Sequence, residues 1–326
     1  EFLNNKFFKL NLDFKIEKKN KNRILTLAEW GYPPFGGGEN WLLNMNKIFY
    51  NNKYENYFIC FSDGYTRQNF NGIKLIDLEY VKIIQMKKNT ADLVKLILNI
   101  NPDFINHQGI NRLYFLKIAN LLNIPFLTGF CFWNDIIKQV YQNINILENN
   151  NLERDDNFNL ILENSYCYAC SEFVNDVIFK YFNKRIDVIE TISLKEDILI
   201  TKNNKKDRKY VTLINCHHNK GGFLLNHLLK YLNINIPLLL IYTEKDDLIN
   251  LENIQNNINE INKRNNINIF YTEKQNIKDI YEVTRIMLIP SLCDETFCRV
   301  GYESRMNNIP IIARSETKTS GFSTKS

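Results

Sequence analysis

The sequence contains no apolar run of about 18 residues, the length a helix needs to cross a membrane, so no transmembrane helix is expected. Its first residues, EFLNNKFFKLNLDF, lack the layout of a signal peptide. The chain also does not begin with methionine, so we expect a fragment of an intracellular, cytoplasmic protein. Glycine, alanine and proline are scarce, and this bias weakens inferences from residue propensity.

A second pair of closely spaced cysteines is missing. Cys167 and Cys170 form a single CxxC, and the residues around them read as a buried strand rather than a metal site. Without another CxxC or a nearby histidine pair, zinc is not expected. The seven cysteines lie mostly inside apolar runs, as Cys60, Cys131 and Cys216 do, which is typical of reduced, buried thiols.

A strong excess of charge is absent as well. The 41 basic and 36 acidic residues leave a net charge of +5, and lysines are interleaved with acids, so nucleic acid is not an expected partner. The apolar share of 44% is that of a globular protein able to bury sizeable cores. At 326 residues, two domains are expected.

The first two hundred residues alternate between strand and helix patterns. The expected strands are Arg23–Glu29, Tyr57–Phe61, Ile73–Leu78, Phe104–His107, Pro125–Thr128, Tyr166–Cys170 and Ile186–Ile189. The expected helices are Asn40–Phe49, Ala91–Ile100, Leu113–Leu122 and Glu172–Phe182. Such alternation predicts an α/β fold with a parallel sheet covered by helices on both faces.

A charged segment, Thr201–Lys209, interrupts the alternation and is the predicted linker. We therefore expect an N-terminal domain at 1–200 and a C-terminal domain at 210–326, each Rossmann-like. The second domain's expected strands are Val211–Asn215, Pro237–Thr243, Ile267–Tyr271, Ile286–Ile289 and Ile309–Ala313. Its expected helices are Phe223–Leu232, Ile277–Arg285 and one that starts near Arg299 and runs through Glu303. Ligands are expected at the carboxyl ends of the strands.

A run of three glycines, Gly36–Gly38, lies between the first strand and the first helix. Glycines there let the backbone take positive φ and approach a ligand, and the following helix presents N–H groups to an anion. The pattern is neither GxGxxG nor a P-loop, which disfavours dinucleotide binding and P-loop NTPases. A flexible turn is the competing interpretation.

The first loop of the second domain, NCHHNKGG, places Lys220 ahead of two glycines, where its ammonium can meet phosphate oxygens. The neighbouring His217 and His218 have no carboxylate or cysteine spaced to complete a metal site, so both are expected in a solvated loop. His227 lies in an amphipathic pattern and is expected to pack.

Two glutamates, Glu295 and Glu303, lie eight positions apart after a strand that ends at Pro290-Ser291. This spacing, a little over two helical turns, lets both carboxylates face one ligand. Carboxylates accept hydrogen bonds from sugar hydroxyls, and a helix N-terminus holds phosphate, so a nucleotide sugar fits this combination. Two surface acids at a helix start are the alternative interpretation.

Together, PPFGGGE, the KGG loop and PSLCDETFCRVGYES…NIPIIA resemble the retaining glycosyltransferases of the GT-B fold, most closely family 4. The resemblance runs from about residue 23 to 313. It implies two Rossmann-like domains facing a cleft and a metal-independent hexosyltransferase without a cofactor. The co-substrate would be a UDP- or GDP-linked sugar and the acceptor a glycan, a lipid or a protein, and a peripheral membrane contact is compatible with it.

The resemblance also implies roles for matching positions. Glu295 would bind hydroxyls of the transferred sugar, Glu303 the ribose hydroxyls, and Lys220 the diphosphate. The other implied assignments are the backbones of Phe297 and Cys298 at the phosphates, Arg299 as added charge, Gly37 and Gly38 beside the donor, and His107 facing the cleft as an acceptor residue.

The chain departs from the family pattern at Cys298, which stands where a glycine is usual, and at its end, where a Gly-Gly-x-x-Glu loop and the closing helices are missing. These departures leave a short, apparently truncated second domain. They favour a second hypothesis, a degenerate GT-B protein that binds a sugar nucleotide or a glycan without turnover. A third, a nucleic-acid-binding protein, rests on the lysines and 17 tyrosines and is disfavoured.

Overall fold

A computed structural model describes most of the chain, and only these residues are discussed. They are 21–34, 36–63, 68–131, 136–137, 155, 157–190, 193–200, 208–215, 220–222, 237–242, 269–273, 276–292 and 294–314. The chain divides into two compact units, the first made of Glu1–Gly129 and Leu160–Cys167, the second of Phe130–Asn159 and Tyr168–Ser326. The predicted boundary with a linker at 201–209 stays a prediction, because 201–207 lie outside these ranges.

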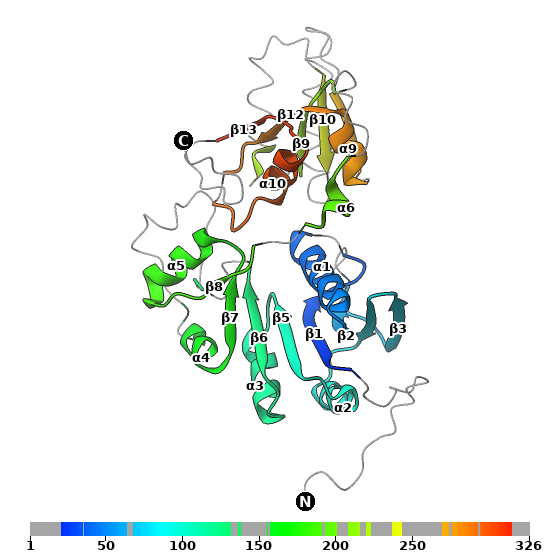
Figure 1. Ribbon diagram of the computed structural model, residues 1–326, viewed down its shortest axis with the longest axis vertical. Helices are drawn as coiled ribbons and strands as arrows, with labels where there is room; N and C mark the ends of the chain where they lie inside the picture. Colours follow the sequence, from blue (N-terminus) through cyan, green and yellow to red (C-terminus); the bar gives the residue numbers. More distant parts are fainter. Residues whose placement is uncertain are drawn as a thin grey trace, which may run out of the picture. The chain divides into compact units, whose positions relative to one another are not determined.

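An eight-stranded sheet is formed in the order β3-β4-β2-β1-β5-β6-β7-β8 (Figure 1). Its strands are β1 (Arg23–Trp30), β2 (Glu55–Ser62), β3 (Ile73–Leu78), β4 (Val81–Met86), β5 (Phe104–Gln108), β6 (Phe126–Phe130), β7 (Tyr166–Ala169) and β8 (Asp187–Val188). The helices between them are α1 (Gly37–Asn51), α2 (Thr90–Ile100), α3 (Arg112–Leu121), α4 (Asn157–Asn164) and α5 (Glu172–Phe182). The predicted α/β alternation is confirmed.

The sequence pattern predicted a parallel sheet, but one pair of its strands is antiparallel. Strand β3 runs antiparallel to β4, and only Glu79 and Tyr80 separate the two strands. So short a connection joins antiparallel neighbours, because a parallel crossover needs a dozen or more residues. Strand β4 was not among the expected strands. A second difference is Tyr166, expected in a buried strand but 72% exposed in β7.

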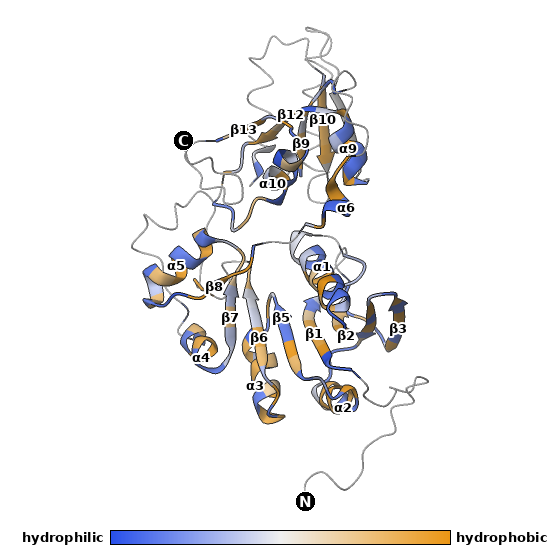
Figure 2. Cartoon of the chain, viewed as in Figure 1, coloured by the Kyte–Doolittle hydropathy of each residue, from blue (hydrophilic) through white to orange (hydrophobic). Residues whose placement is uncertain are grey.

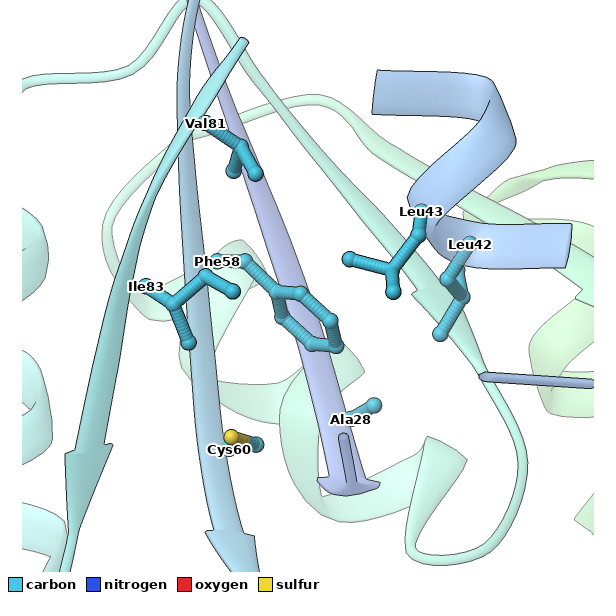
Figure 3. Packing of buried hydrophobic residues seen from close by; sticks show 7 residues of the cluster. All are labelled: Ala28, Leu42, Leu43, Phe58, Cys60, Val81 and Ile83. Carbon is cyan, nitrogen blue, oxygen red and sulfur yellow. The ribbon is translucent and has the colours of Figure 1, made fainter. Parts of the chain in front are cut away.

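Strand β1 has β2 on one side and β5 on the other, both parallel to it. Helix α1 covers β1, β2 and β4 through Leu42 and Leu43, which pack against Ala28, Phe58, Cys60, Val81 and Ile83 of these three strands (Figure 3). Burying side chains of this size contributes about 1.5–3 kcal/mol each. This cluster fixes the helix that begins within the glycine run.

A five-stranded sheet lies in the second unit, in the order β11-β10-β9-β12-β13, with every pairing parallel. Its strands are β9 (Tyr210–Ile214), β10 (Leu238–Tyr242), β11 (Ile269–Glu273), β12 (Thr284–Ile289) and β13 (Ile311–Ala313). The described helices of this region are α6 (Lys195–Ile198), α9 (Ile277–Val283) and α10 (Arg299–Met306). Most of β10 is orange in Figure 2, as a fully buried strand requires.

Predicted and observed elements of this sheet agree within about three residues at either end. The predicted helix at 223–232, with His227, lies outside the described residues. Within the described part of the chain, no helix is both long enough and apolar enough to cross a membrane.

Candidate functional site

The candidate site lies at the carboxyl ends of β9 and β12. These strands are parallel neighbours, with Leu213 paired to Leu288, so the loops that follow them leave the same edge of the sheet. Lys220 follows β9 in the chain, and residues 290–292 and 294–298 lie between β12 and α10. Strand order therefore brings together two motifs that are some seventy residues apart in the sequence.

The two loops touch at Gly221. Its φ is +89°, a conformation that favours glycine, and a Cβ atom placed there would lie 2.4 Å from the carbonyl oxygen of Pro290. No larger residue fits without displacing backbone. The second position of the KGG motif is thus needed for close packing of the two loops, and this packing fixes the start of the Lys220 side chain.

Lys220 and Glu295 form an ion pair, with 2.8 Å between Lys220 Nζ and Glu295 Oε2. The other carboxylate oxygen of Glu295 accepts a hydrogen bond from the Ser291 hydroxyl. The Glu295 side chain is 9% exposed and that of Lys220 35% exposed, so the anion lies inside and the cation at the surface. The structure brings together the two residues expected to bind sugar and diphosphate.

Glu303 is buried among three donors. Arg299 Nη2 lies 2.8 Å from Oε1, the Ser193 hydroxyl donates to the same oxygen at 2.8 Å, and the Tyr281 hydroxyl donates to Oε2 at 2.8 Å. Arg299 was expected to bring positive charge to a phosphate. It lies one helical turn before Glu303 and is paired with it, and a contact with phosphate stays a prediction.

Tyr281 and Cys298 belong to one apolar cluster with Met287, Ile289 and Ile309. Burial, and then the negative charge of Glu303, raise the pKa of Tyr281 well above its ordinary value, so its hydroxyl is a lasting donor. Burial, and then the charge of Glu295, likewise raise the pKa of the Cys298 thiol well above its usual range. Cys298 is therefore a neutral packing residue beside the ion pair, and not a reactive thiolate.

Phe297 and Cys298 directly precede α10, as expected for residues whose backbone faces a helix N-terminal ligand. Both side chains are buried, and the Phe297 ring lies 5.9 Å from that of Tyr302. Their side chains therefore pack into the protein interior. A contact of their N–H groups with phosphate stays a prediction.

The three glycines near the N-terminus do not adopt positive φ, and this part of the prediction is wrong. Gly36, with φ −96°, is the N-cap of α1, and Gly37 and Gly38 are the first residues of that helix. The backbone N–H of Gly36 donates to the Glu39 carboxylate at 2.8 Å, which satisfies one helix-terminal donor. The helix therefore begins three residues before its predicted start, and Gly37 and Gly38 lie in its first turn.

His107 was expected to face a cleft but is fully buried in the first unit. Its ring packs against Phe115, and Nδ1 lies 2.8 Å from the Leu27 carbonyl oxygen. Burial, and then the nearby charge of Arg112, lower its pKa to about 3, so the ring is neutral. A side chain without exposed surface cannot contact an acceptor. The expectation that His107 faces a cleft is therefore wrong, and His107 packs in the core.

Among the described residues, no group of three or more His, Cys, Asp or Glu side chains could hold a metal ion. Neither Cys167 nor Cys170 takes part in a disulfide. His217 and His218 lie outside the described residues.

Sequence reasoning missed Tyr281, Ser193 and Ser291 as partners of the two glutamates. The sequence does contain a signal for Ser291, because this residue lies four positions before Glu295. Tyr281 is 22 positions from Glu303 and Ser193 is 110 positions away, and no spacing rule connects either to it. The completed site holds one surface ammonium and two largely buried carboxylates, a set that can bind an anion and several hydroxyl groups.

No protein-family model matches the chain, and no curated protein matches it either. Several solved structures do match the chain. A glycosyltransferase from Rickettsia africae superposes with a TM-score of 0.66 at 16% identity, over 92% of this chain and 81% of that one. HepE from Anabaena, in complex with UDP and glucose, gives 0.67 at 13% identity, over 91% and 81%.

A third similar structure is the catalytic domain of starch synthase IV from Arabidopsis thaliana, bound to ADP and acarbose. It gives a TM-score of 0.62 at 12% identity, over 94% of this chain and 86% of that one. At identities this low the similarity establishes the fold. The chain has the α/β GT-B fold of these glycosyltransferases.

Proposed function

We propose that this protein transfers a sugar from a nucleotide sugar to an acceptor hydroxyl with retention of anomeric configuration, as a family 4-like hexosyltransferase. The observation that carries the proposal is the Lys220–Glu295 ion pair of 2.8 Å at the carboxyl ends of β9 and β12. In α/β sheets ligands bind at this edge. The solved structures of the same fold with UDP, glucose or ADP bound add support.

Each carboxylate has a distinct task in this proposal. Glu295 accepts hydrogen bonds from hydroxyls of the transferred sugar, and Glu303 from the ribose hydroxyls. Tyr281, Arg299 and Ser193 hold Glu303 in place. Lys220 binds the diphosphate as a point charge, together with the N–H groups at the start of α10.

In the transfer step, the acceptor oxygen forms a bond to the anomeric carbon while the bond from that carbon to the diphosphate oxygen breaks. The departing diphosphate takes the acceptor's proton, and attack from the same face retains the configuration. Neither a protein nucleophile nor a metal is needed. Lys220 stabilises the charge that develops on the leaving diphosphate, which is a preorganised electrostatic contribution. The acceptor is a hydroxyl of a glycan, a lipid or a protein.

Thermal unfolding with and without nucleotide tests the donor half of the proposal. UDP or GDP, with the matching nucleotide sugar, is expected to raise the melting temperature of the wild-type protein, because a ligand that binds only the folded state stabilises it. Lys220→Met is expected to weaken this shift strongly. If UDP, GDP and the matching nucleotide sugars all fail to stabilise the wild-type protein, the proposal is wrong.

Binding without turnover is the second candidate. The buried Cys298 beside Glu295, at a position where the resembled family usually has glycine, favours it. Incubation with UDP-glucose and a panel of acceptors separates the two, since binding with neither hydrolysis nor transfer selects this candidate.

A further inference from the structure

The cation and the anion of the candidate site neutralise each other. Lys220 Nζ lies 2.8 Å from Glu295 Oε2, and the Ser291 hydroxyl supports the other carboxylate oxygen. The contact of Gly221 with Pro290 fixes the two loops that carry the pair. The pair is therefore held in place by the backbone and is not a chance meeting of two long side chains.

A diphosphate that binds Lys220 competes with Glu295 for the ammonium. The Glu295 carboxylate is only 9% exposed, so water can replace little of what it loses. A largely buried charge that loses its partner is costly, and a diphosphate brings further negative charge toward it. Glu295 thus opposes the binding of a bare diphosphate, although Lys220 favours it.

An intact nucleotide sugar differs on this point. Its sugar hydroxyls are hydrogen-bond donors, and they can satisfy the carboxylate that Lys220 leaves. Specificity is a difference between two affinities, and an uncompensated charge is an effective way to disfavour one ligand. The same carboxylate then favours the donor and disfavours the product.

We propose that Glu295 is the residue that discriminates the intact nucleotide sugar from the free nucleoside diphosphate, through its ion pair with Lys220. This inference rests on the proposed function. After transfer the sugar hydroxyls have left with the acceptor, and Lys220 returns to Glu295 as the nucleoside diphosphate dissociates. Glu295 therefore assists product release in addition to orienting the sugar.

Calorimetric titration of UDP and UDP-glucose, repeated with GDP and GDP-mannose, tests the proposal. Glu295→Gln removes the charge at nearly constant shape. It is expected to tighten UDP binding by about fivefold or more and to leave UDP-glucose binding equal or weaker. Glu295→Ala is the second variant, with the same expected direction for UDP. Lys220→Met is expected to weaken the binding of both ligands. In the Lys220→Met background, Glu295→Gln is expected to bring no gain in UDP affinity.

The first unit offers a matched control. Lys88 and Glu29 form an ion pair of 2.7 Å, with exposures of 35% and 12%, close to those of Lys220 and Glu295. Glu29→Gln removes one negative charge from a similar pair. It is expected to leave the affinities for UDP and UDP-glucose unchanged, so a gain seen in Glu295→Gln is not a general effect of net charge.

The outcomes separate the two proposals. If the wild-type protein binds UDP and both Glu295 variants bind it no more tightly, the discrimination by Glu295 is wrong and the proposed function stands. A gain of equal size in Glu29→Gln also overturns it. If the wild-type protein binds none of the four ligands, the proposed function fails and this inference fails with it.

Discussion

An arginine, a glutamate and a tyrosine meet at two places in this molecule. In the first unit, Arg23 Nε lies 2.6 Å from Glu55 Oε2, and the Tyr57 hydroxyl donates to Oε1 at 2.7 Å. In the second unit, Arg299, Glu303 and Tyr281 repeat this pattern with both distances at 2.8 Å. We call these the first and the second trio.

The trios differ in which charge is buried. Arg23 is 3% exposed and Glu55 22% exposed, whereas Glu303 is 5% and Arg299 21% exposed. Arg23 also donates to the carbonyl oxygen of Ile100, so the first trio satisfies a buried cation with protein acceptors. The second surrounds a buried anion with donors, and ribose hydroxyls are donors of the same kind.

Their places in the two sheets differ as well. Arg23 and Glu55 are register partners at the amino ends of β1 and β2. Glu303 lies in α10, which follows the carboxyl end of β12. Ligands of α/β folds bind at carboxyl ends, so equal residue types serve structure at one edge and a candidate ligand at the other. Residue type alone does not reveal whether such a trio serves structure or ligand binding.

The largest difference is expected when the arginines are removed. Arg299→Met leaves the Glu303 carboxylate, which is 5% exposed, with the neutral hydroxyls of Tyr281 and Ser193, and is expected to cost about 3 kcal/mol of unfolding free energy. Arg23→Met leaves Glu55, which is 22% exposed and lies 3.5 Å from Lys82, and is expected to cost about 1 kcal/mol. Urea denaturation measures both. Equal losses in the two variants would contradict the contrast between a buried cation and a buried anion.

Next in size is the effect of the glutamates on nucleotide binding. Glu303→Gln is expected to weaken UDP or GDP binding about tenfold, which is about 1.4 kcal/mol, because the neutral amide is a poorer acceptor for ribose hydroxyls. Glu55→Gln, its counterpart in the first trio, is expected to leave the nucleotide affinity unchanged. Calorimetric titration compares them. A similar change in both variants would remove the functional distinction between the trios.

The tyrosines sharpen the comparison further. Tyr57→Phe and Tyr281→Phe each remove one hydroxyl that donates to a carboxylate and are each expected to cost about 1 kcal/mol of stability. Only Tyr281→Phe is expected to weaken UDP binding as well, roughly threefold, since Glu303 then loses one of the donors that orient it. Thermal unfolding gives the first quantity and titration the second. An unchanged affinity in Tyr281→Phe would show that Tyr281 does not position Glu303.

Much of this architecture could be predicted from the sequence. Ser171 caps α5, and the helix from Glu172 to Phe182 was predicted with the same bounds, because the apolar spacing and the cap agree. The resemblance to GT-B glycosyltransferases implied that Lys220 and Glu295 serve one ligand, and the neighbouring positions of β9 and β12 in the sheet account for their meeting. A local pattern was sufficient for the helix, whereas the meeting of the two motifs needed the resemblance.

The rest depends on contacts that no local pattern contains. The hydroxyls around Glu303 come from Tyr281 in α9 and from Ser193 in the segment before α6. His107 was misplaced because a histidine at a strand end has the same pattern whether it faces solvent or packs between Phe115 and Phe126. The glycines at the start of α1 were misread because a helix start and a positive-φ turn both favour glycine.

The smallest expected effect is a difference in pH dependence. Burial alone would raise the pKa of Glu55, but hydrogen bonds from Tyr57 and Arg23 outweigh it and lower the pKa below its ordinary 4.5. This contribution to stability is present above about pH 4.5 and is lost as pH falls through the lowered pKa. Glu55→Gln is therefore expected to flatten the acid side of the stability profile.

The second trio is expected to act at the opposite end of the profile. The pKa of Tyr281 is raised well above 10 by burial and then by Glu303, so its contribution is complete below about pH 10 and is lost as pH rises further. Tyr281→Phe is expected to flatten the alkaline side, and Glu55→Gln is not. Urea denaturation across the pH range measures both slopes. If either variant changed both sides alike, the two trios would not be electrostatically independent, and the contrast between a buried cation and a buried anion would fail.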